Sequence, residues 1–445
     1  MPISLSSSLI SVLSRAKRRV KPLEVNRVAN LPPELLVHVV EFLADDRDSL
    51  RNTSLVHSAF REPSQRVLFS VLELKPPPWS NRANYAPGST LLELFDSNPA
   101  IAGYPTDISI QGDYAGSRAT WLTKDPMILE ALNRLSFNKI RRFSFQGGHL
   151  PDLWTRLPPT IQAVIIKICN SSSLTSLSLS KAPISLLNTT RSSLRELALE
   201  RSTNIDLDIP LSLEAPKSPT TVERLYVKDH AGFPAAVNWI LDEKNGISLH
   251  CLKYLQMEVP CINESEWILT LLEACCSSLE TFAFGRPTTI AVGSGDEEVN
   301  ANNVNLALLP KLRRLGVQCY AAEDPGSVDP EEENFLDPLP SLITILNTIP
   351  RSNTIEDFHL TMDYGVEDTT RLDVDSWADV DEFLTNKARL PHLKSVRIEV
   401  NNFFDYFVDE IADEVRRSIP KLEASGMLTL RAQTRNWGIF APFSS

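Results

Sequence analysis

The sequence predicts an α/β protein in which strands and helices alternate along a curved parallel sheet, preceded by a short helical segment. A six-residue pattern with apolar residues at its first, fourth and sixth positions recurs ten times, and amphipathic helices fit between the later copies. The chain has 445 residues, more than one compact core usually holds. We therefore expect several modules or one elongated solenoid.

The helical segment spans residues 31–72 and reads as three short helices that are unusually apolar. Between Leu35 and Leu43 only His38 and Glu41 are polar, so the first helix carries apolar residues on more than one face. A unit of roughly 40 residues cannot bury that much apolar surface by itself. The segment is therefore expected to form half of an interface with another polypeptide.

Short motifs in this segment resemble an F-box of the type common in fungal proteins. The motifs are Leu31-Pro32, Glu34-Leu35-Leu36, Phe42-Leu43, Leu55-Val56-His57-Ser58 and Leu68-Phe69. The resemblance implies a three-helix F-box at residues 27–74 that docks on the Skp adaptor of a cullin-based ubiquitin ligase. It also implies that the rest of the chain recognises a protein substrate.

The resemblance also assigns an adaptor contact, in which Phe60 stands where many family members have tryptophan. The positions carried over to the adaptor contact are Leu31, Pro32, Leu35, Val39, Phe42, Leu55, Val56 and Phe60. The alternative interpretation is an ordinary three-helix lead-in to a larger domain.

The recurring six-residue pattern predicts strands with one apolar face. Its copies are IRRFSF at Ile140, IQAVII at Ile161, LTSLSL at Leu174, LRELAL at Leu194, VERLYV at Val222, LKYLQM at Leu252, LETFAF at Leu279, LRRLGV at Leu312, IEDFHL at Ile355 and LKSVRI at Leu393. Positions four and six point the same way on an extended strand, and positions three and five point oppositely. Helices are expected at Asn263 to Cys276, Leu339 to Ile349, Asp375 to Arg389 and Phe403 to Ile419.

These copies resemble degenerate leucine-rich repeats, which implies a solenoid over residues 104–432. The Asn or Cys expected at the ninth position occurs only as Cys169 and Asn401. The step from Ile161 to Leu174 is shorter than a repeat, so one of those two copies is misassigned. The alternative is a mixed α/β domain with chance matches.

The flanks are predicted from their composition. Residues 1–26 are basic and serine-rich and suggest a disordered tail, with a mitochondrial presequence or a nuclear import signal as alternatives. Residues 75–103 form a proline-rich linker and lead-in, and 433–445 a tail whose Trp437, Phe440 and Phe443 would cover the last repeat. The ends of the solenoid are expected to contain helices at Leu91 to Asn98 and Pro126 to Leu135, and strands at 106–110 and Met427 to Leu430.

The net charge of −12 is concentrated in two acidic ranges, 321–338 and 363–382. Both are interpreted as solvated loops, with a docking patch for basic partners as the alternative. An acidic balance argues against nucleic-acid binding, which depends on clustered Lys and Arg.

Positions three and five of the copies would face a bound protein. They include Arg142, Glu196, Arg224, Tyr226, Tyr254, Gln256, Arg314, Asp357, His359 and Arg397. Arginine and tyrosine are favoured in protein interfaces, although a solvated sheet face without a ligand is the simpler outcome for any single residue.

No catalytic motif is present, and neither a cofactor nor a metal site is predicted. The six cysteines lack zinc-like spacing and are interpreted as buried thiols in a reducing compartment. No apolar run is long enough to span a bilayer, so no membrane association is expected.

Taken together, the two resemblances imply a non-catalytic substrate-recognition subunit of a Skp-cullin-F-box ubiquitin ligase, cytoplasmic or nuclear. Two alternatives stay open: a repeat scaffold whose F-box-like helices only cap the solenoid, and an unrecognised hydrolase.

Overall fold

The structure is a computed structural model of the chain. It describes residues 32–76, 86–112, 121–147, 153–190, 193–200, 220–228, 233–258, 265–285, 304–323, 335–336, 338–364, 374–402 and 407–434. The chain divides into two compact units, residues 1–195 with 202–220 and residues 196–201 with 221–445. The predicted basic tail and the aromatic cover at Trp437, Phe440 and Phe443 lie outside the described residues.

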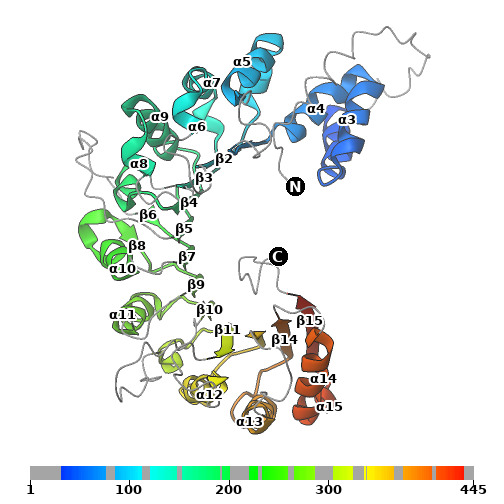
Figure 1. Ribbon diagram of the computed structural model, residues 1–445, viewed down its shortest axis with the longest axis vertical. Coiled ribbons are helices and arrows are strands. Elements are labelled where there is room, and N and C mark those ends of the chain that lie inside the picture. The colour runs from blue at the N-terminus through cyan, green and yellow to red at the C-terminus, as the bar shows by residue number, and fades with distance from the viewer. Residues whose placement is uncertain are drawn as a thin grey trace. The chain divides into compact units, whose positions relative to one another are not determined.

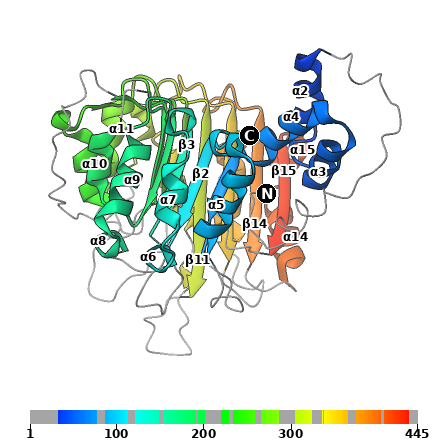
Figure 2. The ribbon, with the colours of Figure 1, turned by 90° about the horizontal axis from the view of Figure 1, so that it is seen from above.

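Three helices open the described part of the first unit, as the apolar pattern predicts. They are α2 (Pro33–Glu41), α3 (Arg47–Val56) and α4 (Ser58–Leu68), and Figure 2 shows them as one packed group. The Asp46 carboxylate accepts a hydrogen bond from the Ser49 N–H at the start of α3 (3.0 Å), and His57 Nδ1 accepts one from the Ala59 N–H at the start of α4 (3.1 Å). Leu36, Val40 and Leu50 are buried in this group.

The helical group continues directly into a sheet. Helix α4 leads into β1 (Val71–Leu74), which pairs in parallel with β2 (Asp107–Gln111). The Ser70 carbonyl accepts hydrogen bonds from the N–H groups of Thr106 (2.8 Å) and Asp107 (3.0 Å). The sheet therefore begins at Val71, inside the range predicted for the helical module. The helix predicted at Leu91 to Asn98 is present as Pro87–Ser97.

The first unit has the parallel strand order β1-β2-β3-β4, with the helices that follow β1 in the chain on one side of the strands (Figure 1). Phe143 and Phe145 on β3 are buried, whereas Arg142 is exposed and Ser144 half-buried, which is the predicted alternation. The remaining elements are α5 (Pro87–Ser97), η3 (Pro99–Gly103), α6 (Trp121–Lys124), α7 (Ile128–Asn133), η4 (Phe137–Lys139), β3 (Arg142–Gln146), α8 (Leu153–Arg156), α9 (Pro159–Cys169), β4 (Ser176–Ser180) and η5 (Ile184–Thr189).

The second unit has the parallel strand order β5-β7-β9-β10-β11-β13-β14-β15, with β12 antiparallel to β11. Its strands are β5 (Glu196–Glu200), β7 (Arg224–Lys228), β9 (Tyr254–Glu258), β10 (Thr281–Gly285), β11 (Arg314–Glu323), β12 (Phe335–Leu336), β13 (Asp357–Tyr364), β14 (Ser395–Asn402) and β15 (Leu428–Thr434). Its helices are α10 (Phe233–Leu241), η6 (Glu243–Asn245), α11 (Ser265–Cys275), η9 (Leu306–Leu308), α12 (Leu339–Leu346), α13 (Val374–Thr385), α14 (Val408–Ser418) and α15 (Pro420–Ser425). The short strands β6 (Thr220–Thr221) and β8 (Ile247–Ser248) lie outside this sheet.

Nine of the ten predicted copies form strands of the parallel sheet. The copy at Ile161 is wrong, because its residues lie in α9, which begins at Pro159. Ile161, Val164, Ile165 and Ile168 are all buried at helical spacing. An apolar residue three positions after another fits a helix as well as a strand, so this copy matched by coincidence.

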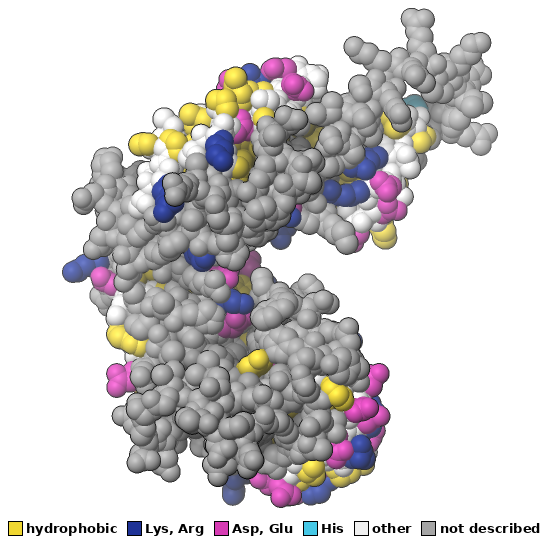
Figure 3. Space-filling view, in the orientation of Figure 1, with side chains coloured by type: hydrophobic (Ala, Val, Ile, Leu, Met, Phe, Trp, Pro, Cys, Tyr) yellow, Lys and Arg dark blue, Asp and Glu magenta, His cyan; other side chains and the backbone are white. Residues whose placement is uncertain are grey.

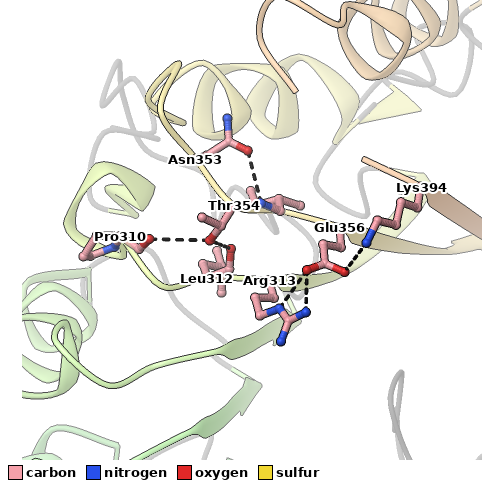
Figure 4. A network of polar contacts seen from close by, with 8 residues as sticks. Pro310, Leu312, Arg313, Asn353, Thr354, Glu356 and Lys394 are labelled. Carbon is pink, nitrogen blue, oxygen red and sulfur yellow. Dashed lines mark hydrogen bonds and ion pairs between the residues drawn. The ribbon is translucent and has the colours of Figure 1, made fainter. Parts of the chain in front are cut away.

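Hydroxyl groups link neighbouring strands at their starts. In four copies a Ser or Thr stands directly before the first apolar position, and its hydroxyl donates to the carbonyl of the first apolar residue one copy earlier. The pairs are Ser173 to Ile140 (2.8 Å), Ser193 to Leu174 (2.8 Å), Ser278 to Leu252 (2.9 Å) and Thr354 to Leu312 (2.9 Å). Figure 4 shows the hydrogen bond from Thr354 to Leu312. We call these four hydrogen bonds hydroxyl links; each one gives a backbone carbonyl at the start of a strand a hydrogen-bond donor.

The interpretation of the acidic range 363–382 as a solvated loop is wrong for two of its acidic residues, and the described residues of the range 321–338 include parts of the strands β11 and β12. Asp363 is buried on β13, and Asp381 is buried on α13. The Asp381 carboxylate accepts hydrogen bonds from the N–H groups of Lys421 (2.9 Å) and Leu422 (2.7 Å) in the first turn of α15. One carboxylate of this acidic range, that of Asp381, therefore caps the start of a helix that lies about forty residues later in the sequence.

Candidate partner-binding surfaces

Helices α2 and α3 carry an exposed apolar surface. We call Leu35, Val39, Phe42, Leu55 and Val56 the helical apolar surface; their exposed fractions are 50%, 47%, 85%, 57% and 75%. Among the described residues eight large apolar side chains are exposed, and six of them belong to this segment once Val37 is included. Exposed large apolar side chains of the described residues are therefore concentrated in this segment. Figure 3 shows hydrophobic and charged side chains side by side on this part, at the upper right.

Helix α2 is apolar on two faces. Leu35, Val39 and Phe42 follow one another at helical spacing and lie on one face. Leu36 and Val40 lie beside them and are buried against the rest of the helical group. The buried face holds the helix in place, and the exposed face remains open to a partner.

The other predicted adaptor contacts differ in accessibility. Pro32 is exposed immediately before α2, and Phe60 is half-buried on α4. Leu31 lies outside the described residues.

The second candidate surface is the open face of the sheet in the second unit. Strand register brings the predicted residues into two rows. The first row is Glu196, Arg224, Tyr254, Thr281, Arg314, Asp357 and Ser395, and the second is Ala198, Tyr226, Gln256, Ala283, Gly316, His359 and Arg397. The predicted Arg142 lies on β3 of the first unit.

Two tyrosines form a cluster on this face. The Tyr226 and Tyr254 rings lie 5.0 Å apart, the Arg224 guanidinium lies 5.6 Å from the Tyr254 ring centroid, and the Tyr254 hydroxyl is 2.8 Å from Gln256 Oε1. Burial raises the pKa of both phenols, and Glu196 raises that of Tyr226 further. The Glu196 carboxylate and the Arg224 guanidinium thus lie beside the two rings, and Arg224 is exposed.

Three predicted contact residues are less accessible than expected. Tyr254, Gln256 and His359 are exposed by only 7%, 4% and 4%. His359 Nε2 lies 3.5 Å from Glu399 Oε1, and this partner lowers the pKa of the Glu399 carboxyl. The exposed members of the predicted set on this face are Arg224, Arg314 and Arg397.

The sequence pattern missed a polar network beyond the six-residue unit. The Asp363 carboxylate accepts hydrogen bonds from Gln318 Nε2 (2.6 Å) and Asn401 Nδ2 (2.7 Å). These residues lie on β11, β13 and β14, which run longer than the pattern indicated. Continued alternation after His359 was the signal that could have found Asp363.

The cysteines differ from one another in exposure. Cys169, Cys275 and Cys319 are buried, but Cys251 is exposed and Cys276 half-buried, so the prediction of buried thiols is wrong for these two. Burial raises the pKa of the Cys169 and Cys275 thiols to about 12. Cys261 lies outside the described residues.

Two further features were searched for in the described ranges. They contain no group of three or more His, Cys, Asp or Glu side chains arranged to hold a metal ion. No helix in them is long and apolar enough to cross a membrane.

Comparison with known proteins gives only a distant likeness in structure. The sequence matches no family model and no curated protein. A crystal structure of a protein from Bacteroides fragilis is similar over 78% of this chain and 72% of its own, with 13% sequence identity and a TM-score of 0.32. The class of protein defined here is thus an α/β protein with a large parallel sheet and an N-terminal helical group.

Proposed function

We propose that the chain is a non-catalytic substrate receptor of a Skp-cullin-F-box ubiquitin ligase. In this proposal α2, α3 and α4 form the F-box and bind the Skp adaptor, and the strands and helices that follow form a leucine-rich-repeat-like solenoid that binds a protein target. A separate enzyme then transfers ubiquitin to a target lysine held within reach, so the receptor acts by proximity.

One observation carries the proposal. The residues that the F-box resemblance assigns to the adaptor contact include all five members of the helical apolar surface. Leaving them in water is costly, since burying a large apolar side chain is worth about 1.5–3 kcal/mol. A partner protein that covers them removes this cost.

The target side of the proposal is supported by the open sheet face. Arg224, Arg314 and Arg397 are exposed there beside the tyrosine cluster. Arginine and tyrosine supply a large share of the binding energy in protein interfaces. Such a face suits a protein target, which we propose meets the receptor in the cytoplasm or nucleus.

Reconstitution tests the proposal. The full chain is mixed with purified Skp adaptor and cullin and passed over a size-exclusion column. We expect a stable complex that contains all three proteins. Failure of the wild-type chain to elute with the adaptor would remove the proposed ligase role.

A second candidate function is favoured by the join between α4 and β1. Gln65 on α4 accepts a hydrogen bond from Asn98 Nδ2 (3.2 Å), and Ser70 binds the start of β2, so the helices close one end of the sheet. A repeat scaffold would use them only as this cap. Such a scaffold would not bind the adaptor, so the same column experiment separates the two functions.

A further inference from the structure

A pocket of about 650 Å³ lies between the N-terminal helices and the open face of the first sheet. One wall is formed by Ala44 and Asp45 in the turn between α2 and α3, by Arg47 and Leu50 of α3, and by Val67 of α4. Its floor comes from β1 to β4. This volume lies within the range of sites that take a drug-sized ligand or a short peptide.

Four serines form the floor of the pocket. Ser109, Ser144 and Ser178 are in register on β2, β3 and β4, and Ser176 lies two residues before Ser178. Across the described ranges the hydroxyls of these four serines have no hydrogen-bond partner, and each residue is half-buried. Small side chains leave the space open, and their hydroxyls offer both donors and acceptors.

Charges at the pocket balance one another. Glu73 is paired with Lys75 (2.5 Å), and Asp107 is paired with Arg142 (2.8 Å). Asp45 and Arg47 contribute one charge of each sign to the helical wall. The lining carries three acidic and two basic side chains, and Lys75 outside it pairs with Glu73. The pocket therefore has little net charge, which favours an uncharged polar ligand over a strongly charged one.

The spacing of the hydroxyls fits an extended chain. Ser176 and Ser178 point the same way on β4, and residues two apart on a strand lie roughly 6.6 Å apart. An extended peptide parallel to β4 repeats its main-chain groups at the same interval. Both serine hydroxyls can then bind peptide N–H and C=O groups of one ligand.

We infer that this pocket binds a short, extended and uncharged polar segment of a protein. The inference rests on the proposed function only in calling that protein a ubiquitination target. The pocket would hold the target directly beside the helices that carry the helical apolar surface.

Selection from short random peptides displayed on phage, with the immobilised full chain as bait, tests the inference. We expect enrichment of sequences rich in Gly, Ser, Thr, Asn and Gln. Enriched peptides, synthesised and titrated, should bind the Ser176→Val/Ser178→Val variant about tenfold or more weakly, because two hydrogen bonds are lost. The matched control is Ser172→Val, at an exposed serine in the turn before β4 that does not line the pocket, which should leave binding unchanged.

Several outcomes would overturn the inference: no enrichment, enrichment of only acidic or only basic peptides, or equal binding to wild type and the double variant. A Ser176→Ala/Ser178→Ala variant repeats the test if the valine variant does not fold. Adaptor binding is measured on the same samples. If peptide binding fails while adaptor binding is intact, the pocket inference is wrong. If adaptor binding fails while peptide binding is intact, the proposed ligase role is wrong.

Discussion

In the second unit, single side chains connect the turns that precede neighbouring strands. Arg313 Nε and Lys394 Nζ both bind the Glu356 carboxylate, at 2.8 Å each, from the turns that precede β11 and β14 (Figure 4). Both hydrogen bonds favour the charged carboxylate and lower the pKa of Glu356 to about 2. The Glu356 carboxylate thus joins three consecutive turns.

This network predicts a pH dependence of stability. Because the folded-state pKa of Glu356 is below its ordinary value of 4.5, its contribution is complete above about pH 4.5 and is lost as the pH falls toward 2. Glu356→Gln should therefore reduce the loss of thermal stability between pH 5 and pH 3. Glu410→Gln, at an exposed carboxylate of α14 without an ion pair in the described residues, is the control. Identical pH profiles of the Glu356 variant and wild type would contradict the assignment.

The hydroxyl link from Thr354 to Leu312 predicts a change in the free energy of unfolding that does not depend on pH. Thr354→Val keeps the shape of the side chain but removes the donor to the Leu312 carbonyl. We expect the free energy of unfolding to fall by about 1 kcal/mol, measured by denaturant titration. Thr344→Val is the matched control, since the Thr344 hydroxyl bonds only a carbonyl of its own helix, Pro340 O. An unchanged Thr354→Val variant would show that the hydroxyl link contributes nothing.

At the scale of elements, the packing of helices depends on close approach at one glycine. Gly88 lies in α5, and its N–H donates to Asp125 Oδ2 at 2.6 Å. A Cβ at this position would lie 2.3 Å from the Ile128 backbone nitrogen of α7. The two helices could not remain this close with a larger residue.

Gly88→Ala should therefore destabilise the chain by about 1–3 kcal/mol, the usual cost of overpacking. Helix propensity alone predicts the opposite sign, because alanine is favoured over glycine by about 1 kcal/mol inside a helix. Thermal unfolding distinguishes the two expectations: overpacking lowers the melting temperature of the variant, and helix propensity alone would raise it. Gly103→Ala is the control, because its Cβ would meet only the ends of the Lys139 and Ser136 side chains at 3.5 Å. A stabilised Gly88→Ala variant would contradict the close approach.

The order of elements could be predicted from the sequence because each strand repeats the same alternation of apolar and polar residues. The copy at Ile161 failed because four apolar residues at helical spacing also satisfy the strand pattern. The six-residue pattern ended before the strands did. Asp363 and its partners lie beyond that pattern and were therefore missed. The pairing of Asp381 with α15 depends on residues about forty positions away, which local patterns do not report.

At the scale of the whole chain, the apolar surplus of residues 31–72 could be predicted because a short segment has a limited interior. The sequence alone did not separate the two faces of α2, since Leu35 and Leu36 are the same residue type. Tertiary packing decides which of the two is buried: Leu36 is exposed by 6% and Leu35 by 50%. The same reasoning could not find the pocket above the serine floor, because one wall of it comes from the helical segment and the floor from β1 to β4.

The most direct test of the account is the affinity of the full chain for purified Skp adaptor, measured by calorimetry for wild type and for Leu35→Ala/Phe42→Ala. The account predicts binding by wild type and a loss of about 100-fold or more in the variant, since burying each of the two large apolar side chains is worth about 1.5–3 kcal/mol and every 1.4 kcal/mol is about tenfold in affinity. Thermal stability should stay nearly constant because both side chains are exposed. Met127→Ala, at an exposed apolar residue elsewhere in the first unit, should bind as wild type does. Equal affinity of the double variant and wild type, or no binding by either, would contradict the account.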